Sequence, residues 1–337
     1  MAAGTTAIIL LSLVALSKLP AGQKQLRKEA EALRRKADAG HAGAMYQLGV
    51  RYANGRGGLA KDDAQALDWY RKAAEAGHAD ALHYLQLREE VEALRRKAEA
   101  GDANGMNDLG VMYQNGQGGL AKDETQAVIW YRKAAEAGNT NGMNDLGFMY
   151  QNGQGGLAKD DTQAVIWYRK AAEAGNTNGM TNLGVMYQNG QGGLAKDGTQ
   201  AVIWYRKAAE AGNTNGMTNL GFMYQNGQGG LAKDYAQAVI WYRKAAEAGN
   251  ATGMSNLGFM YQNGQGGLEK DDTQAVIWYR KAAEAGNAIG MSNLGSMYQN
   301  GEGGLAKDDA QAVIWYRKAA EAGSELAKSN LRRMGRL

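Results

Sequence analysis

The 337-residue chain has no cysteine and a single proline, Pro20. Without cysteine, disulfides, thiolate nucleophiles and thiolate metal sites are all excluded, so packing alone must hold the fold. One proline beside 48 glycines excludes a disordered Pro/Gly-rich tract and indicates that glycine fills defined backbone positions. The three histidines, His41, His78 and His83, lack the spacing with which one helix ligates a metal, so we expect no metal and no cofactor.

Net charge is also low over most of the chain, because acidic and basic residues nearly balance there. The formal net charge of +4 comes from residues 18–40, with seven basic and three acidic side chains, and from residues 324–337, with four basic and one acidic. The long middle is therefore slightly acidic and offers no basic surface of the kind that binds nucleic acid. We expect no nucleic-acid partner.

The first 17 residues carry no charge, and residues 7–16 (AIILLSLVAL) are almost wholly apolar. A membrane-spanning helix needs about 20 apolar residues, so this run is closer to a signal-peptide core. Residues 1–22 are thus predicted to be a signal or membrane-anchor segment, and the protein to be membrane-anchored or exported (periplasmic). Basic residues follow the run and none precedes it, which in a retained anchor would keep the next segment cytoplasmic. A cytoplasmic protein in which the run is a buried cap is the alternative.

Six of the seven tryptophans recur every 37 residues, from Trp130 to Trp315. A period in this range indicates a solenoid of repeated supersecondary units. The unit DANGMNDLGVMYQNGQGGLAKDETQAVIWYRKAAEAG, at residues 102–138, recurs up to residue 323, and residues 41–77 are a divergent copy. Residues 78–101 between them are interpreted as a unit that has lost its glycine loop.

Each unit is predicted to form two amphipathic helices. In residues 102–138, the two apolar faces follow i, i+3, i+4, i+7 spacing: Met106, Leu109, Gly110 and Tyr113, then Ala127, Trp130, Tyr131 and Ala134. Between them, the glycines of NGQGGLAKD suit a compact turn, Asp123 is the expected N-cap and Gly138 the expected stop. One pair cannot bury its apolar faces alone, whereas stacked pairs bury a continuous core. The expected fold is an all-α solenoid of stacked helix-turn-helix repeats.

Capping helices are expected at both ends of the repeat array, at residues 23–40 and 324–337. Ser324 is the expected N-cap of the second of these. Its packed side is predicted to comprise Leu326, Asn330, Leu331 and Met334.

The motif Leu-Gly-x-x-Tyr-x-x-Gly-x-Gly, then Asp, then Ala-x-x-Trp-Tyr-Arg-Lys-Ala-Ala-Glu-Ala-Gly is complete in residues 109–138 and resembles the Sel1-like repeat, a relative of the tetratricopeptide repeat. The resemblance covers residues 41–323, as seven full units plus the loop-deleted unit at 78–101. It implies a right-handed α-solenoid with first helices on the concave side, no catalysis in most members, and adaptor work in membrane-associated or signalling complexes. The chain departs from the family's cysteine-rich, penicillin-linked branch because it has no cysteine.

Two columns of residues are apolar where a helical wheel points about 150° away from the core. On the second helices this column is a candidate convex ridge: Ile129, Ile166, Ile203, Ile240, Ile277 and Ile314. On the first helices it is a candidate concave protein-binding face: Val111, Phe148, Val185, Phe222 and Phe259, flanked by Asp108, Asp145, Asn182, Asn219 and Asn256. The alternatives are isoleucines tucked between neighbouring helices and sequence drift at a tolerant exposed site.

No nucleophile is paired with a base, and the loop GQGGLAKD has neither P-loop nor dinucleotide-binding spacing, so we expect no enzyme and no catalytic residues. We expect a non-catalytic protein–protein interaction scaffold or adaptor whose partners are other proteins. A second copy of the chain is the alternative partner, through the convex ridge. A glycan-binding module is a further alternative, because rings beside Asn, Gln and Asp side chains suit a sugar chain, although its usual Trp and Tyr platforms fall here on core faces.

Overall fold

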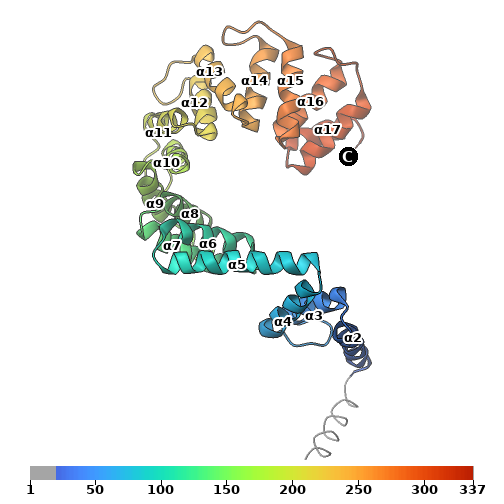
Figure 1. Cartoon of the computed structure of the whole chain (residues 1–337). Helices are drawn as coiled ribbons and strands as arrows, with labels where there is room; N and C mark the ends of the chain where they lie inside the picture. Colours follow the sequence, from blue (N-terminus) through green and yellow to red (C-terminus); the bar gives the residue numbers. More distant parts are fainter. Residues whose placement is uncertain (1–19, 337) are drawn as a thin grey trace, which may run out of the picture. The chain divides into compact units, whose positions relative to one another are not determined.

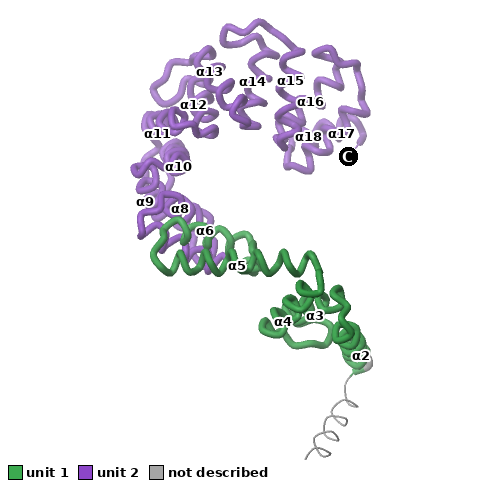
Figure 2. Tube along the Cα trace, viewed as in Figure 1, with its two compact units in different colours: residues 1–123 green, residues 124–337 purple. Residues whose placement is uncertain are grey.

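The computed structural model describes residues 20–336, which form 17 α-helices and no strand (Figure 1). The apolar run at residues 7–16 lies outside these described residues. Two compact units divide the chain, unit 1 up to residue 123 and unit 2 from residue 124 onward (Figure 2). Over residues 20–336, no helix combines the length and apolar character needed to cross a membrane.

Unit 1 contains α2 (Ala21–Asp38), α3 (Ala42–Asn54), α4 (Asp63–Glu75), α5 (Ala79–Glu99) and α6 (Ala103–Asn115). In unit 2, the second helices of the repeats are α7 (Glu124–Glu136), α9 (Asp161–Glu173), α11 (Gly198–Glu210), α13 (Tyr235–Glu247), α15 (Asp272–Glu284) and α17 (Asp309–Glu321). The first helices are α8 (Thr140–Asn152), α10 (Thr177–Asn189), α12 (Thr214–Asn226), α14 (Ala251–Asn263) and α16 (Ala288–Asn300), and the last helix is α18 (Glu325–Arg333).

Side-chain caps explain where the helices of a repeat begin. The Asp160 carboxylate accepts hydrogen bonds from the backbone N–H groups of Thr162 (2.9 Å) and Gln163 (3.0 Å) and so starts α9. Gly153 ends α8 in the left-handed conformation, with φ of +64°. Because the same caps recur every 37 residues, the helix boundaries recur as well.

In unit 2, each first helix packs against the second helix of its own repeat and against the second helix of the preceding one. In unit 2, first helices of consecutive repeats also contact each other: α8 with α10, α10 with α12, α12 with α14 and α14 with α16. Their close approach places the first helices on the inner side of the stack that unit 2 forms (Figure 1).

In the second helices of unit 2, a tyrosine is more deeply buried than the tryptophan that precedes it. Tyr205 is fully buried, and a Cβ on Gly184 would lie only 2.6 Å from the Tyr205 ring. The ring therefore enters the space that the missing side chain leaves. Trp204 is only partly buried, and the Lys207 Nζ lies 4.3 Å above its ring. The predicted core residues Ala127, Trp130, Tyr131 and Ala134 are all buried, but the centre of the core face lies nearer the tyrosine than the prediction placed it.

The last helix covers the open end of the final repeat. Ser324 accepts a hydrogen bond of 3.2 Å from the Ala327 N–H, and Ala327 and Leu331 are buried against Tyr316. The prediction that Leu326 packs here is wrong, since its side chain is 59% exposed. Ala327 follows it by about 100° around the helix and faces α17 instead.

The N-terminal helix α2 begins at Ala21, two residues before the predicted start at residue 23. Pro20 occupies its N-cap with φ of −56°. A proline at the start of a helix loses no helical hydrogen bond, because the first N–H groups have no partner there.

Candidate functional site

The outward side of the first helices in unit 2 carries one stripe of four positions at i, i+4, i+7 and i+11 spacing. On α8 the stripe comprises Asn141, Asp145, Phe148 and Asn152, of which all but Asp145 are exposed. On α12 it comprises Asn215, Asn219, Phe222 and Asn226. The first helices α8 to α14 therefore present one central residue between polar flanks on the same side, whereas the stripe of α16 begins with the exposed Ile289.

Three phenylalanines lie at the centre of these stripes, in α8, α12 and α14. Phe148, Phe222 and Phe259 are 43%, 42% and 41% exposed. The next turn is held in place, because the Asn152 side chain donates a hydrogen bond of 2.9 Å to the Phe148 carbonyl oxygen. The predicted outward position of these rings is observed.

The other members of the predicted concave face are less accessible. Val111 and Val185 are partly buried, and Val185 packs beside Tyr205 in the core of its repeat. Ser296, the corresponding residue of α16, is partly buried too. The accessible apolar part of the face is thus the three phenylalanines, which we call the Phe column.

The predicted polar flanks are mostly half-buried. Asp108 is exposed, whereas Asp145, Asn182, Asn219 and Asn256 are partly buried. Burial raises the pKa of the Asp145 carboxyl, and a hydrogen bond of 3.1 Å from the Asn144 amide opposes that shift. The Asn182 amide donates to the same Asn144 side chain at 2.9 Å, which links α10 to α8.

Four consecutive first helices carry no charged residue at all. Neither aspartate, glutamate, lysine nor arginine occurs in α10, α12, α14 or α16, and α8 has only Asp145. The second helices, by contrast, each carry an Arg-Lys pair and a glutamate. Phe222 and Phe259 therefore lie among amides and hydroxyls alone, whereas Phe148 has one charged neighbour in its stripe, the partly buried Asp145.

An asparagine at each repeat boundary fixes the spacing between neighbouring stripes. The Asn176 side chain caps α10 by accepting a hydrogen bond of 2.8 Å from the Gly179 N–H. Its amide also donates to the Asn141 side chain of the preceding repeat at 2.7 Å. Asn213 makes the same bond to Asn178 at 2.8 Å. Asn141 and Asn178 were absent from the predicted site, although counting seven residues back from Phe148 and Val185 would have found them.

The six isoleucines of the candidate convex ridge lie on the opposite side of the repeats, each 40–44% exposed. They are not enclosed between neighbouring helices, so that alternative is wrong. Beside Ile166, the side chains of Arg169, Lys170 and Glu173 line a shallow cleft of about 410 Å³. The Lys170 Nζ also lies 4.3 Å over the Trp167 ring, so its position is set by an intramolecular contact.

The three histidines lie in unit 1, and His41 and His83 are exposed. His41 and His78 occupy the N-cap positions of α3 and α5 without making a side-chain capping bond. The His78 ring stacks on Tyr46 with a centroid distance of 4.4 Å. Among residues 20–336, no group of three His, Cys, Asp or Glu side chains is arranged to hold a metal ion.

The repeat is found in known proteins. Seven segments match the Sel1 repeat family model: residues 42–78, 103–139, 140–176, 177–213, 214–250, 251–287 and 288–324. No curated protein matches the chain significantly.

Two solved structures are similar over most of the chain. A Sel1 repeat protein from Oxalobacter formigenes is 30% identical over 71% of this chain and 95% of its own, with a TM-score of 0.62. A protective antigen present in uropathogenic Escherichia coli strains, displaying an SLR fold, is 36% identical over 90% of this chain and 67% of its own, with a TM-score of 0.57. With seven matched repeats and relatives of this kind, the chain belongs to the Sel1 repeat family.

Proposed function

We propose that this protein is a non-catalytic scaffold that binds a partner protein through the Phe column of unit 2. Sel1 repeat proteins are generally protein-interaction scaffolds without catalytic activity, which supports the general role. The observation that carries the specific surface is the exposure of Phe148, Phe222 and Phe259 on first helices that have no charged residue apart from Asp145 in α8. Binding surfaces between proteins are enriched in aromatic side chains and depleted of charge at their centres.

The energetics favour these rings as contact residues. An exposed phenylalanine contributes little to folding, yet its burial in an interface removes a large apolar area from water. The surrounding asparagine amides can donate and accept hydrogen bonds, so a polypeptide backbone laid across them leaves few polar groups unsatisfied. Because successive first helices touch, the stripes form one continuous surface and not isolated patches.

Glycan binding has less support. Sugar platforms need accessible tryptophan or tyrosine rings, but Tyr205 is fully buried and the Lys207 Nζ covers one face of Trp204. The same arrangement recurs along unit 2, as with Tyr242 and the Lys244–Trp241 pair. The most exposed rings of unit 2 belong to the Phe column.

A matched pair of triple variants tests the proposal. Phe148→Ser, Phe222→Ser and Phe259→Ser remove the Phe column, and Ile166→Ser, Ile240→Ser and Ile277→Ser remove exposed isoleucines from the same three repeats. Affinity purification of each tagged full chain from native cells, with quantitative mass spectrometry, should show one partner lost from the phenylalanine variant and retained by the isoleucine variant.

Both variants should keep the helical circular-dichroism signal and melting temperature of the parent chain, since all six residues are exposed. Loss of the partner from the isoleucine variant alone would contradict the proposal and assign binding to the convex ridge. A change in oligomeric state of that variant, measured by light scattering, would instead assign the ridge to self-association.

We also propose that the apolar run at residues 7–16 takes the scaffold to a membrane or across it. Its composition and the basic residues that follow it support this proposal. Cell fractionation of the full chain beside a chain that starts at residue 23 tests it. The full chain should sediment with membranes or be exported, and the shortened chain should do neither. Equal distribution of the two chains would contradict the proposal.

A further inference from the structure

In the unit at residues 78–101, no second helix folds back against the first. In a complete repeat the second helix folds back along the first, as α9 does on α8, where the Tyr168 hydroxyl donates to Gln151 at 2.7 Å. The predicted loop-deleted unit at residues 78–101 contains one continuous 21-residue helix, α5. Without a turn, its second half cannot return to cover its first half.

The core leucine of this unit shows the consequence. Leu85 stands 37 residues after Leu48, in the same register from the helix start. The corresponding leucines of all complete repeats are at most 1% exposed: Leu48, Leu109, Leu146, Leu183, Leu220, Leu257 and Leu294. Leu85 alone in this register is partly exposed. The helix that would cover it is the one that the unit lacks.

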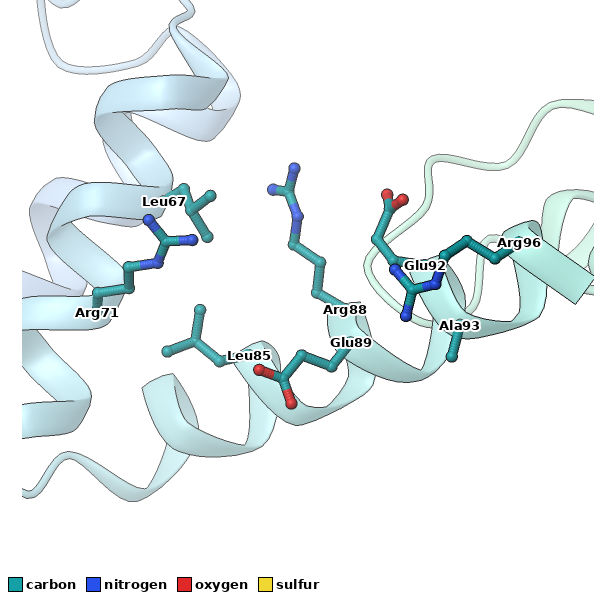
Figure 3. A pocket seen from close by; sticks show the side chains of 8 residues that line it. All are labelled: Leu67, Arg71, Leu85, Arg88, Glu89, Glu92, Ala93 and Arg96. Atoms are coloured by element: carbon teal, nitrogen blue, oxygen red, sulfur yellow. The ribbon is translucent and has the colours of Figure 1, made fainter.

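An open cleft of about 690 Å³ lies at this place, between α4 and α5 (Figure 3). Leu67 from α4 and Leu85 from α5 point toward each other and form an apolar floor, and Ala93 lines the cleft farther along α5. The lining residues of α5 run from Leu85 to Arg96, about 16 Å or three helical turns. That length suits one face of a short helix.

Three arginines surround the floor without partners. Arg71, Arg88 and Arg96 line the cleft, and among residues 20–336 none of them forms an ion pair or a side-chain hydrogen bond. Figure 3 shows the Arg71 and Arg88 guanidinium groups directed into the space between the helices. Of the two acidic lining residues, Glu92 already pairs with Arg95 at 3.5 Å. The cleft therefore has an excess of unpaired positive charge.

The unpaired state of Arg71 has a cause in the sequence. At the same position of later repeats, arginine donates to a tyrosine of the next first helix, as Arg206 does to Tyr224 at 2.9 Å. In the register of α5 that tyrosine is replaced by Glu89, which lines the same cleft and makes no ion pair with Arg71. Both the covering helix and the usual acceptor are absent here.

We propose that this cleft binds an amphipathic α-helix of a partner protein, with an apolar stripe over Leu67 and Leu85 and acidic side chains facing Arg71, Arg88 and Arg96. The bound helix takes the place of the missing second helix and completes the repeat. A second copy of this chain is a poor occupant, because its terminal helices α2 and α18 are rich in lysine and arginine. The site occurs once in the array and is separate from the Phe column.

The test uses a pair of fluorescent peptides and the full chain. The probe has about 14 residues, four helical turns, with leucine at alternating third and fourth positions and glutamate elsewhere. The second peptide replaces every glutamate with lysine. Fluorescence anisotropy should show saturable binding of the acidic peptide and at least roughly tenfold weaker binding of the basic one. Equal affinity for both peptides would overturn the proposal.

Matched variants locate the binding. The affinity for the acidic peptide should fall more than roughly tenfold in the triple variant Arg71→Glu, Arg88→Glu and Arg96→Glu, because these substitutions reverse the charge of the cleft. Arg34→Glu, Arg35→Glu and Arg332→Glu reverse the same number of exposed charges elsewhere and should leave the affinity within about twofold. A similar loss in both triple variants would overturn the proposal, since binding would then follow net charge alone.

A third variant needs no charge change. Replacing residues 78–101 with the 37-residue sequence of residues 176–212 restores a complete repeat and should abolish peptide binding while increasing the helical signal.

The triple serine variant of the Phe column should bind the acidic peptide like the parent chain, which separates this site from the proposed function. Retained binding by the completed array, or binding of phosphatidylserine vesicles without binding of the peptide, would overturn the proposal.

Discussion

The Arg206 guanidinium donates a hydrogen bond of 2.9 Å to the Tyr224 hydroxyl and joins the second helix of one repeat to the first helix of the next. The same contact occurs between Arg169 and Tyr187 at 3.0 Å. Since each repeat touches only its neighbours, such bonds set the coupling along the array.

Arg206→Met should therefore destabilise the protein. Loss of a partly buried hydrogen bond costs about 1 kcal/mol, and the array should also unfold less cooperatively. Arg317→Met is the matched control, because Arg317 reaches only the Arg336 carbonyl oxygen, at 3.4 Å, on an exposed surface. Urea denaturation followed by circular dichroism measures both. An equal loss of stability in the two variants would show that the hydrogen bond from Arg206 to Tyr224 does not contribute to stability.

Gly221→Ala should cost about 1–3 kcal/mol, because the added methyl group overpacks the core. Its Cβ would lie 2.7 Å from Cε1 of Tyr242, which is fully buried and cannot move away. Gly43 gives the opposite expectation, since nothing lies within 4 Å of a Cβ there. Gly43→Ala should stabilise its helix by about 0.5–1 kcal/mol. The denaturant midpoints of the two variants should thus shift in opposite directions. A shift in the same direction would contradict the close packing of the Tyr242 ring against Gly221.

Tyr205→Ala should destabilise the array more than Trp204→Ala. Removing a fully buried large ring costs about 3–5 kcal/mol. Trp204 is partly exposed, so its removal opens a smaller cavity and costs less. Chemical denaturation of the two variants under the same conditions measures the order. The reverse order would restore the tryptophan-centred core that the sequence predicts.

Asp145→Asn should stabilise the protein at neutral pH. Burial raises the pKa of the Asp145 carboxyl in the folded state, so the fold favours the protonated form and the charged form costs stability. That cost is present at pH 7 and disappears as the pH falls through the raised folded-state pKa.

The stability difference between Asp145→Asn and the parent chain should therefore be largest near neutral pH and vanish toward about pH 4, the ordinary range for aspartate. Asp108→Asn is the control, because Asp108 occupies the same column of α6 and is exposed. Melting temperatures measured at several pH values decide the matter. A loss of stability in Asp145→Asn at pH 7 would contradict this reading of the buried carboxyl.

The repeat period and the helix limits follow from the sequence, because Trp204, Asp197 and Gly212 recur every 37 residues and mark the period, the helix start and the helix stop. The outward position of Phe222 also follows from the wheel alone. The deeper burial of Tyr205 than of Trp204 could not be predicted from the sequence. It depends on how closely the Tyr205 ring packs against Gly184 in another helix.

The cleft at Leu85 could not be predicted from the sequence. The 61-residue spacing between Trp69 and Trp130 indicates a shortened unit. It does not say whether the two remaining halves fold back or join, and the uncovered leucine results from their joining into α5. Local propensity cannot decide this, because both halves are helical in either case.

Site-specific photo-crosslinking in living cells tests the binding surface most directly. A photoreactive phenylalanine analogue is placed at Phe148, Phe222 or Phe259 in one set of full-length chains and at Ile166, Ile240 or Ile277 in the other. We expect the same partner protein to be covalently captured from all three positions of the Phe column and from none of the isoleucine positions. Capture from the isoleucine positions alone, or adducts between copies of this chain alone, would contradict the assignment of the first-helix surface as the binding face.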